Sequence, residues 1–143
     1  MNSQKKNCKL LEANFEPIGN DITLYRGCNY LELSQNPLNE KIYNKGFISC
    51  SSRKYIASKF IEERTNIYEP ALLGIKVNQN TNLINVEAIF NKDAGNHEEE
   101  YIIRKRAILV LREERICDEQ ELCGKGSRNI KGIHCLKLEL NPN

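Results

Sequence analysis

The chain has 143 residues, of which 40% are hydrophobic and 28% are charged, and its net charge is +2. This length supports one ordinary domain, and the composition is typical of a folded protein surrounded by water rather than of an extended disordered one. Lys and Arg alternate with Asp and Glu along the chain, so a nucleic-acid partner is not expected, because such partners need concentrated positive charge.

The N-terminal half is predicted to alternate short helices with short strands. Helical segments place apolar residues three and four positions apart, whereas strand segments alternate apolar and polar residues. In chain order, the expected elements are a helix over 3–14, a strand over 22–25, a helix over 30–38, a strand over 46–51 and a helix over 53–64. Ser52 is the expected N-cap of the last helix. Arg26 and Gly27 follow the first strand directly, so an Arg is expected where a strand ends.

The C-terminal half is predicted to be rich in strands. These segments are short and contain alternating or β-branched residues. They cover residues 72–77, 83–88, 99–104, 107–111 and 133–140. Helices come early and strands late, without the regular alternation of a doubly wound sheet, which favours an α+β fold. We expect one domain over residues 1–143, with residues 1–19 as a candidate helical extension.

The chain contains six cysteines, and it shows neither a signal-peptide pattern nor an Asn-x-Ser/Thr glycosylation site. We therefore expect free thiols in a reducing compartment, with the cytoplasm as the place of action. Delivery into the cytosol of another cell stays open. The spacings of Cys117, Cys123, His134 and Cys135 match no common zinc site, so no metal is expected. No run approaches the roughly 20 apolar residues that span a membrane, so no membrane partner is expected.

Three adjacent glutamates, Glu98, Glu99 and Glu100, precede the apolar run 101–103. Side chains alternate between the faces of a strand, so Glu98 and Glu100 are expected on one face and Glu99 on the other. Two carboxylates on one surface raise each other's proton affinity, a cost more readily kept at a working site. Without other signals, three glutamates are more often a solvated strand edge.

Two further polar groups lie upstream. The Arg26 guanidinium can bind a phosphate at two points, and Gly27 allows a ligand to approach the backbone. Ser49 and Ser51 flank Cys50 on one expected strand face, where both can donate hydrogen bonds. A surface Arg at a turn and ordinary strand hydroxyls are the simpler interpretations of these residues. No His lies nearby in the sequence, so a Ser-His hydrolase is not indicated.

The order of these motifs is more specific than any one of them. Tyr25-Arg26-Gly27, then 46–51, then 98–103 resembles the Arg, Ser-Thr-Ser and Glu-x-Glu signature of the mono-ADP-ribosyltransferases. That family includes clostridial binary toxins and vertebrate arginine-specific enzymes. The resemblance covers residues 20–112 and departs from the family at Cys50, which replaces a Thr, and after Glu100, where a frequent Pro is missing. It implies mixed, mainly antiparallel sheets that form a split sandwich with an NAD cleft, flanked by short helices.

The resemblance also implies the roles of individual residues. Glu100 would stabilise an oxocarbenium-like transition state, Ser49 would orient Glu100, and Glu98 would meet the acceptor. The residues implied in NAD binding are Arg26, Gly27, Ser49, Ser51, Phe60 and Glu100.

The expected activity is transfer of ADP-ribose from NAD, the co-substrate, to a side chain of a target protein, with release of nicotinamide. Arginine is the first choice of acceptor, because a Glu at position 98 resembles the arginine-modifying members, and the loop 91–97 is expected to recognise the target. Two alternatives stay open. The same site could give ADP-ribose to water as an NAD glycohydrolase, or the fold could persist as an inactive binding module.

Overall fold

A computed structural model describes residues 12–30, 33, 41–44, 46–63, 69–89, 99–117 and 132–141. The expected helices over 3–14 and 30–38 lie mostly outside these ranges. Glu98 and the loop 91–97 lie wholly outside them, as do Cys8 and Cys123. None of the described helices is long and apolar enough to cross a membrane.

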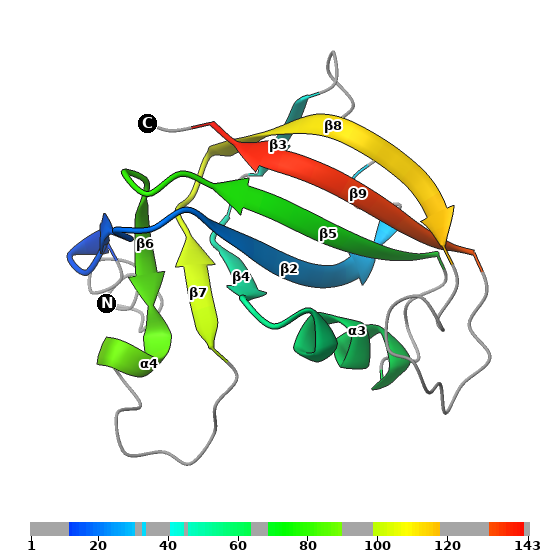
Figure 1. Ribbon diagram of the computed structural model, residues 1–143, viewed down its shortest axis with the longest axis horizontal. Helices are drawn as coiled ribbons and strands as arrows, with labels where there is room; N and C mark the ends of the chain where they lie inside the picture. The colour runs from blue at the N-terminus through cyan, green and yellow to red at the C-terminus, as the bar shows by residue number, and fades with distance from the viewer. Residues whose placement is uncertain are drawn as a thin grey trace, which may run out of the picture.

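Strands dominate the described part of the chain. In order, the elements are β1 (Glu16–Pro17), β2 (Ile22–Asn29), β3 (Lys41–Asn44), β4 (Ile48–Ser51), α3 (Lys54–Glu63), β5 (Pro70–Val77), β6 (Asn82–Asn85), α4 (Val86–Ile89), β7 (Glu100–Ile103), β8 (Ala107–Cys117) and β9 (Ile133–Leu140) (Figure 1). With few short helices beside a large sheet, the chain has the expected α+β class.

The strands form one hydrogen-bonded sheet in the order β1-β6-β7-β4-β2-β5-β9-β8-β3. The β5 and β9 pair is parallel, and the other pairs are antiparallel. The ladder is weakest between β2 and β4, which pair only at Tyr25 and Ser51. There the sheet bends, and β4, β7 and β6 cross the direction of the long strands (Figure 1). The sheet is therefore split into a long-stranded and a short-stranded half.

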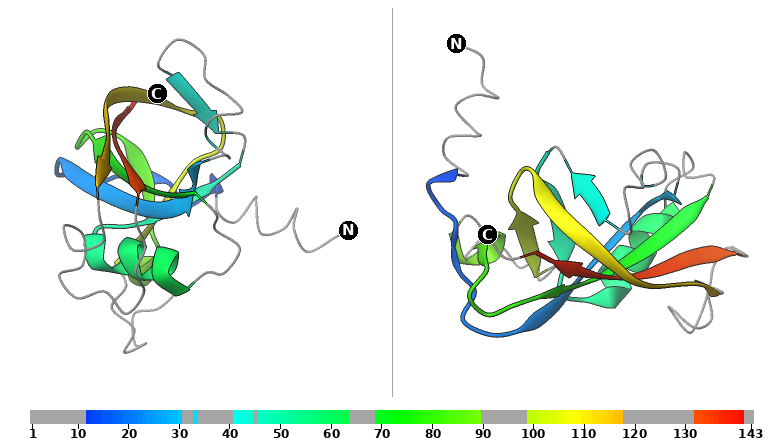
Figure 2. Two further views of the ribbon diagram at one scale, coloured as in Figure 1. Left: turned by 90° about the vertical axis from the view of Figure 1, so that its right-hand side faces the viewer. Right: turned by 90° about the horizontal axis from the view of Figure 1, so that it is seen from above.

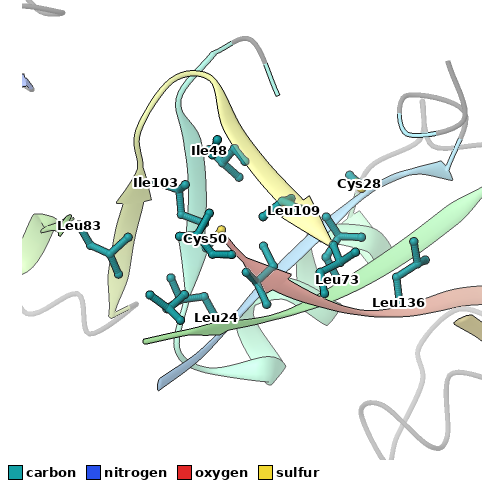
Figure 3. Close-up of a cluster of buried hydrophobic side chains, with 14 of the residues drawn as sticks. Leu24, Cys28, Ile48, Cys50, Leu73, Leu83, Ile103, Leu109 and Leu136 are labelled. Atoms are coloured by element: carbon teal, nitrogen blue, oxygen red, sulfur yellow. The ribbon is translucent and has the colours of Figure 1, made fainter. Parts of the chain in front are cut away.

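The main core fills the space between the two halves of the sheet. Alternation places Leu24 of β2 and Ile75 of β5 on the inner face of the long strands, both completely buried. From the short strands, Cys50 and Ile103 meet them, and Figure 3 shows Leu24, Cys50 and Ile103 gathered between β2, β4 and β7. Burial of this apolar surface from both halves is the main force that holds the bent sheet together.

A second apolar cluster lies on the outer face of the long strands, under α3. Ala57 and Ile61 point from one side of α3 toward Leu72, Cys117 and Ile133. The sequence pattern predicted an apolar face of Ile56, Ala57, Phe60 and Ile61. Ala57 and Ile61 are buried as predicted, whereas Phe60 is exposed and Ile56 is half-buried. Figure 2 shows α3 on one side of the long strands and β3 on the other.

Several predicted boundaries were wrong. β2 does not end before Arg26 but continues to Asn29, because the backbone of Gly27 stays in the ladder with β5. The strand expected over 83–88 ends at Asn85, whose side-chain Oδ1 accepts the N–H of Ala88 at 3.2 Å and so caps the short helix α4. β8 is longer than predicted, and β3 was not predicted.

Ser52 is not the N-cap that the sequence predicted. The helix α3 begins at Lys54, and the hydroxyl Oγ of Ser51 accepts the backbone N–H of Arg53 at 3.0 Å. The hydroxyl of Ser52 instead donates to a carboxylate oxygen of Glu99 at 2.9 Å. The carboxylate of Glu99, the residue before β7, therefore binds this hydroxyl in place of a helix N–H.

The expectation of free thiols holds for only part of the cysteines. Cys28 and Cys50 are free and buried, but Cys117 and Cys135 form a disulfide. The two come from antiparallel neighbours, in which Cys117 faces Ile133 and Cys135 faces Arg115. Their Cα atoms are 6.3 Å apart, although 18 positions separate them in sequence. The register of β8 and β9 brings the two cysteines together, although their spacing in the sequence did not predict a disulfide.

Candidate active site

A cavity of about 200 Å³ opens where β2 and β4 diverge, between α3 and the start of β7. Its lining residues are Tyr25, Arg26, Gly27, Ser49, Cys50, Ser51, Ile56, Ala57, Phe60 and Glu100. The structure thus brings together six of the seven residues singled out from the sequence, and the seventh, Glu98, lies outside the described residues. In the described ranges, no group of three or more His, Cys, Asp or Glu side chains is arranged to hold a metal ion.

Arg26 bridges the split between the two halves of the sheet. Beyond the single pair of Tyr25 with Ser51, the backbones of β2 and β4 no longer pair. Here the guanidinium Nη1 of Arg26 donates to the carbonyl oxygen of Ser49 at 2.8 Å. A guanidinium carries five N–H donors, so this bond orients the group toward the cavity while leaving most of its capacity for an anionic ligand.

Glu100 and Ser49 are joined across the neighbouring strands β7 and β4. The register places Glu100 opposite Ser51, and Ser49 lies two residues further along the same strand. Such diagonal neighbours are within side-chain reach. The hydroxyl of Ser49 donates to the carboxylate Oε2 of Glu100. The Ser49 hydroxyl therefore holds the Glu100 carboxylate at the cavity.

Gly27 allows α3 to approach β2 closely. A Cβ atom at this position would lie 2.5 Å from the carbonyl oxygen of Ala57 and 2.7 Å from Cγ1 of Ile61. The closest neighbour of Gly27 is thus a helix, whereas the sequence interpretation was that the glycine leaves room for a ligand. This close approach brings Ala57 and Phe60 of α3 to the edge of the cavity.

Cys50 lines the cavity, but it is buried and belongs to the main core. Burial raises the pKa of the Cys50 thiol to about 12; Arg26 opposes this shift, while Cys28 and Glu100 add to it. The thiol stays protonated at neutral pH, so it is not a nucleophile. Ser51 is also buried, and its bond to the N–H of Arg53 closes the corner between β4 and α3.

Phe60 supplies an exposed aromatic ring at the edge of the cavity, with 39% of its surface accessible. A flat aromatic ring at the edge of a cavity can stack on a flat ring of a bound ligand. Ile56 was expected on the apolar face of α3 but not as a site residue, and it also lines the cavity. Its position four residues before Phe60 on a helix was the signal that could have found it.

The strand expected over 99–104 begins at Glu100, and Glu99 has a left-handed backbone with φ of 49°. Strand alternation therefore does not extend from Glu100 back to Glu98. Strand alternation therefore no longer supports Glu98 and Glu100 on one face, and the position of Glu98 stays a prediction.

The cavity combines three chemical environments. Arg26 provides a fixed positive charge on one side, Glu100 provides a carboxylate, and α3 provides apolar and aromatic surface. Such a site can bind an anionic ligand with a flat ring, and it can stabilise positive charge that develops beside the carboxylate.

No family model and no curated protein matches the sequence. Solved structures do match. Plx2a, an ADP-ribosyltransferase toxin from Paenibacillus larvae, aligns with a TM-score of 0.63 and 12% identity over 95% of this chain and 70% of its own. BECa, an ADP-ribosylating toxin of C. perfringens solved with NADH, aligns at 0.68 and 14% over 99% of this chain and 36% of its own. Vis, an ADP-ribosyltransferase from Vibrio splendidus solved with agmatine, aligns at 0.61 and 15% over 96% and 57%.

The chain therefore has the fold of ADP-ribosyltransferase toxins, which confirms the fold that the motifs implied. It spans little more than a third of BECa and just over half of Vis.

Proposed function

We propose that this chain, built on the fold of these ADP-ribosyltransferase toxins, binds NAD in the cavity and transfers ADP-ribose to a protein side chain. The observation that carries the proposal is the bond from the Ser49 hydroxyl to the Glu100 carboxylate, in one cavity with Arg26. These are the residues, in the chain order, of the family signature. The likeness of the fold to BECa, a toxin solved with NADH, supports a nicotinamide dinucleotide as the ligand.

The cavity of about 200 Å³ is too small for a whole dinucleotide, because sites that enclose drug-sized ligands measure about 300–1,000 Å³. It fits the nicotinamide and its ribose, with Phe60 beside the flat ring. Arg26 would then bind the pyrophosphate, since a guanidinium matches phosphate oxygens at two points. The adenosine end would extend over the surface.

The reaction breaks the bond between the nicotinamide nitrogen and C1 of the ribose. The electron pair of this bond leaves with nicotinamide, so positive charge develops on the ribose ring. Glu100 opposes that charge and accepts a hydrogen bond from a ribose hydroxyl, which stabilises the transition state more than the ground state. Ser49 keeps the carboxylate in place. A nucleophile from the target then forms the new bond to C1 and loses its proton.

The proposed acceptor is an arginine side chain. Vis, which shares the fold, was solved with agmatine, a small guanidinium compound. In this chain Glu98 precedes Glu100 by two positions, and a carboxylate there can pair with a guanidinium and take its proton during attack. The target would be an unidentified protein in a cytosol, either of the producing cell or of a cell into which the chain is delivered.

Labelled NAD tests the proposal when it is incubated with the protein and either a cell lysate or agmatine. Transfer predicts label in protein bands and on agmatine, with nicotinamide released. Glu100→Gln keeps an oxygen for the Ser49 hydroxyl but loses the charge, so the rate should fall by about 100- to 1,000-fold. Glu113→Gln is the matched control, because Glu113 is a half-exposed carboxylate paired with Lys137 at 3.2 Å and does not line the cavity.

Other outcomes identify the alternatives. Free ADP-ribose without labelled acceptor would show an NAD glycohydrolase using the same residues. NAD binding without release of nicotinamide, unchanged in Glu100→Gln, would show a binding module and contradict the proposed chemistry.

A further inference from the structure

Glu99, the residue before the proposed catalytic carboxylate, has an unusual backbone. Its φ of 49° lies in the left-handed region, which residues with a side chain adopt rarely because Cβ then crowds the carbonyl oxygen. A non-glycine residue keeps such a conformation only where its surroundings hold it there. The contacts of Glu99 should therefore explain what holds it.

Both the backbone and the side chain of Glu99 are engaged. The N–H of Glu99 donates to Oε1 of Glu87 at 2.7 Å, and its carbonyl oxygen accepts the N–H of Ser52 at 3.2 Å. In the side chain, Oε1 accepts the Ser52 hydroxyl at 2.9 Å, and Oε2 lies 3.7 Å from Nε of Arg53. Three elements thus meet at this residue: α4, the corner between β4 and α3, and β7.

These contacts continue the pairing of β4 and β7 beyond the ends of both strands. Ser51 faces Glu100 at the last position of the ladder, and Ser52 and Glu99 add a backbone bond and a side-chain bond one step further. Glu100 is consequently held from two directions: the Ser49 hydroxyl holds its carboxylate, and the Ser52 contacts hold the peptide that leads into it.

We propose that Glu99 is a positioning residue for Glu100, and that the Ser52 hydroxyl is its partner in this task. The proposal rests on the function proposed above. The left-handed turn at Glu99 directs the chain into β7, and the bond to Ser52 fixes the angle at which the Glu100 carboxylate enters the cavity. The Glu99 carboxylate contacts Ser52 and Arg53, whereas the Glu100 carboxylate lines the cavity in which the substrate would bind.

Three substitutions of Glu99 distinguish the contribution of its side chain from that of its left-handed backbone. Glu99→Gln keeps an oxygen for Ser52 and loses only a half-exposed ion pair with Arg53, which contributes little. Glu99→Ala loses the acceptor and keeps the strained φ, whereas Glu99→Gly relieves the φ and also loses the acceptor. Displacement of a reacting group by about 1 Å can cost about 100-fold in rate.

Steady-state cleavage of NAD is the first measurement. We expect Glu99→Ala and Glu99→Gly to lower kcat by about 10- to 100-fold, with KM for NAD changed less than about 2-fold. Glu99→Gln should stay within about 3-fold of the unsubstituted chain, and Ser52→Ala should resemble Glu99→Ala. In the double variant the two losses should not add, since both remove the same bond. Glu139→Ala is the matched control, because it removes a half-exposed carboxylate that pairs with Arg112 outside the cavity.

The second measurement needs no activity. The carboxyl carbon resonance of Glu100, observed by NMR at one neutral pH, should move in Glu99→Ala and by a similar amount in Ser52→Ala, which keeps the charge of Glu99, and should move least in Glu99→Gln. An unchanged Glu100 resonance in Ser52→Ala would overturn the positioning role, as would a lowered melting temperature with normal kcat per folded molecule. If the unsubstituted chain cleaves no NAD, the proposed function fails, and the NMR comparison still decides the role of Glu99.

Discussion

The main core and the cavity share strands, but apolar contacts hold the core together, whereas specific hydrogen bonds shape the cavity. β4 sends Ile48 and Cys50 into the core, and between them Ser49 faces the cavity. In the core, many apolar side chains contribute by area, and each has several neighbours of the same kind. At the cavity, a few polar atoms each have one specific partner, such as Arg26 on the Ser49 carbonyl and Ser49 on Glu100.

This difference means that stability and chemistry depend on separate sets of residues, although the two sets alternate along one strand. Loss of area in the core should weaken folding and leave the site geometry of folded molecules unchanged. Loss of a polar contact at the cavity should change the site geometry and leave the stability of the fold nearly unchanged. Gly27 is the exception, because it is part of the sheet and also sets the distance of α3 from the cavity.

The largest expected effect is in the core. Ile75→Ala removes most of a side chain with 0% exposure, which should lower the free energy of unfolding by about 4 kcal/mol. Urea unfolding measures this loss. The fraction that stays folded should cleave NAD with normal kcat and KM, and a clear fall in kcat per folded molecule would show that core and cavity are not separable.

Gly27→Ala should affect both regions. The new Cβ would meet the helix backbone at 2.5 Å, so α3 must move away, with a loss of about 3 kcal/mol in stability and of the position of Phe60. Gly74→Ala is the matched control, because a Cβ there meets its nearest atom at 3.6 Å, an ordinary contact. Equal melting temperatures for the two variants would contradict the close approach of α3.

A smaller effect, confined to the cavity, is expected for Arg26→Lys. A lysine keeps the positive charge but loses the planar fork that reaches the Ser49 carbonyl and a phosphate together. Calorimetry should show affinity for NAD lowered by about 10-fold, or about 1.4 kcal/mol. Arg112→Lys, on an exposed ion pair with Glu139, should leave affinity unchanged. Normal NAD affinity in Arg26→Lys would remove Arg26 from the binding site.

The last effect concerns the pKa of Cys50 and appears only at alkaline pH. Because burial raises this pKa to about 12 in the folded state, the unfolded thiol, with a pKa of about 8.5, ionises first. Between these values the folded state binds more protons, so stability falls as pH rises, by at most about 1.4 kcal/mol per pH unit. Unfolding at pH 8 and pH 10 measures the slope. Cys50→Ala should show a shallower slope, and an identical one would contradict the pKa shift.

The sequence predicted most where a local pattern reflects burial. Residues 136–140 alternate apolar and polar side chains, and β9 has the expected bounds, residues 133–140. The local sequence pattern was misleading at a glycine and at an asparagine whose contacts with a helix decide where a strand ends. Gly27 was expected beyond the end of a strand, but it lies within β2, and its missing Cβ allows the close approach of α3. Asn85 ends β6 and caps α4.

For the cavity, the resemblance of the three motifs to the mono-ADP-ribosyltransferase signature predicted which side chains lie together, and Arg26, Ser49 and Glu100 line one cavity. The register of β4 against β7 is a long-range property that local patterns do not contain. For the same reason the sequence missed the partnership of Glu99 with Ser52, and it missed the pairing of Cys117 with Cys135.

The position of β9 also has a consequence for how the chain reaches its native state. β9, the last described strand, lies between β5 and β8 and pairs with β5 in parallel. Until residues 133–140 leave the ribosome, β5 and β8 each lack a neighbour, and unpaired edges of this kind recruit other chains. Pairing of strands so distant in sequence is slow. Folding should therefore finish only after synthesis of β9, which leaves an interval in which a chaperone can hold the chain unfolded.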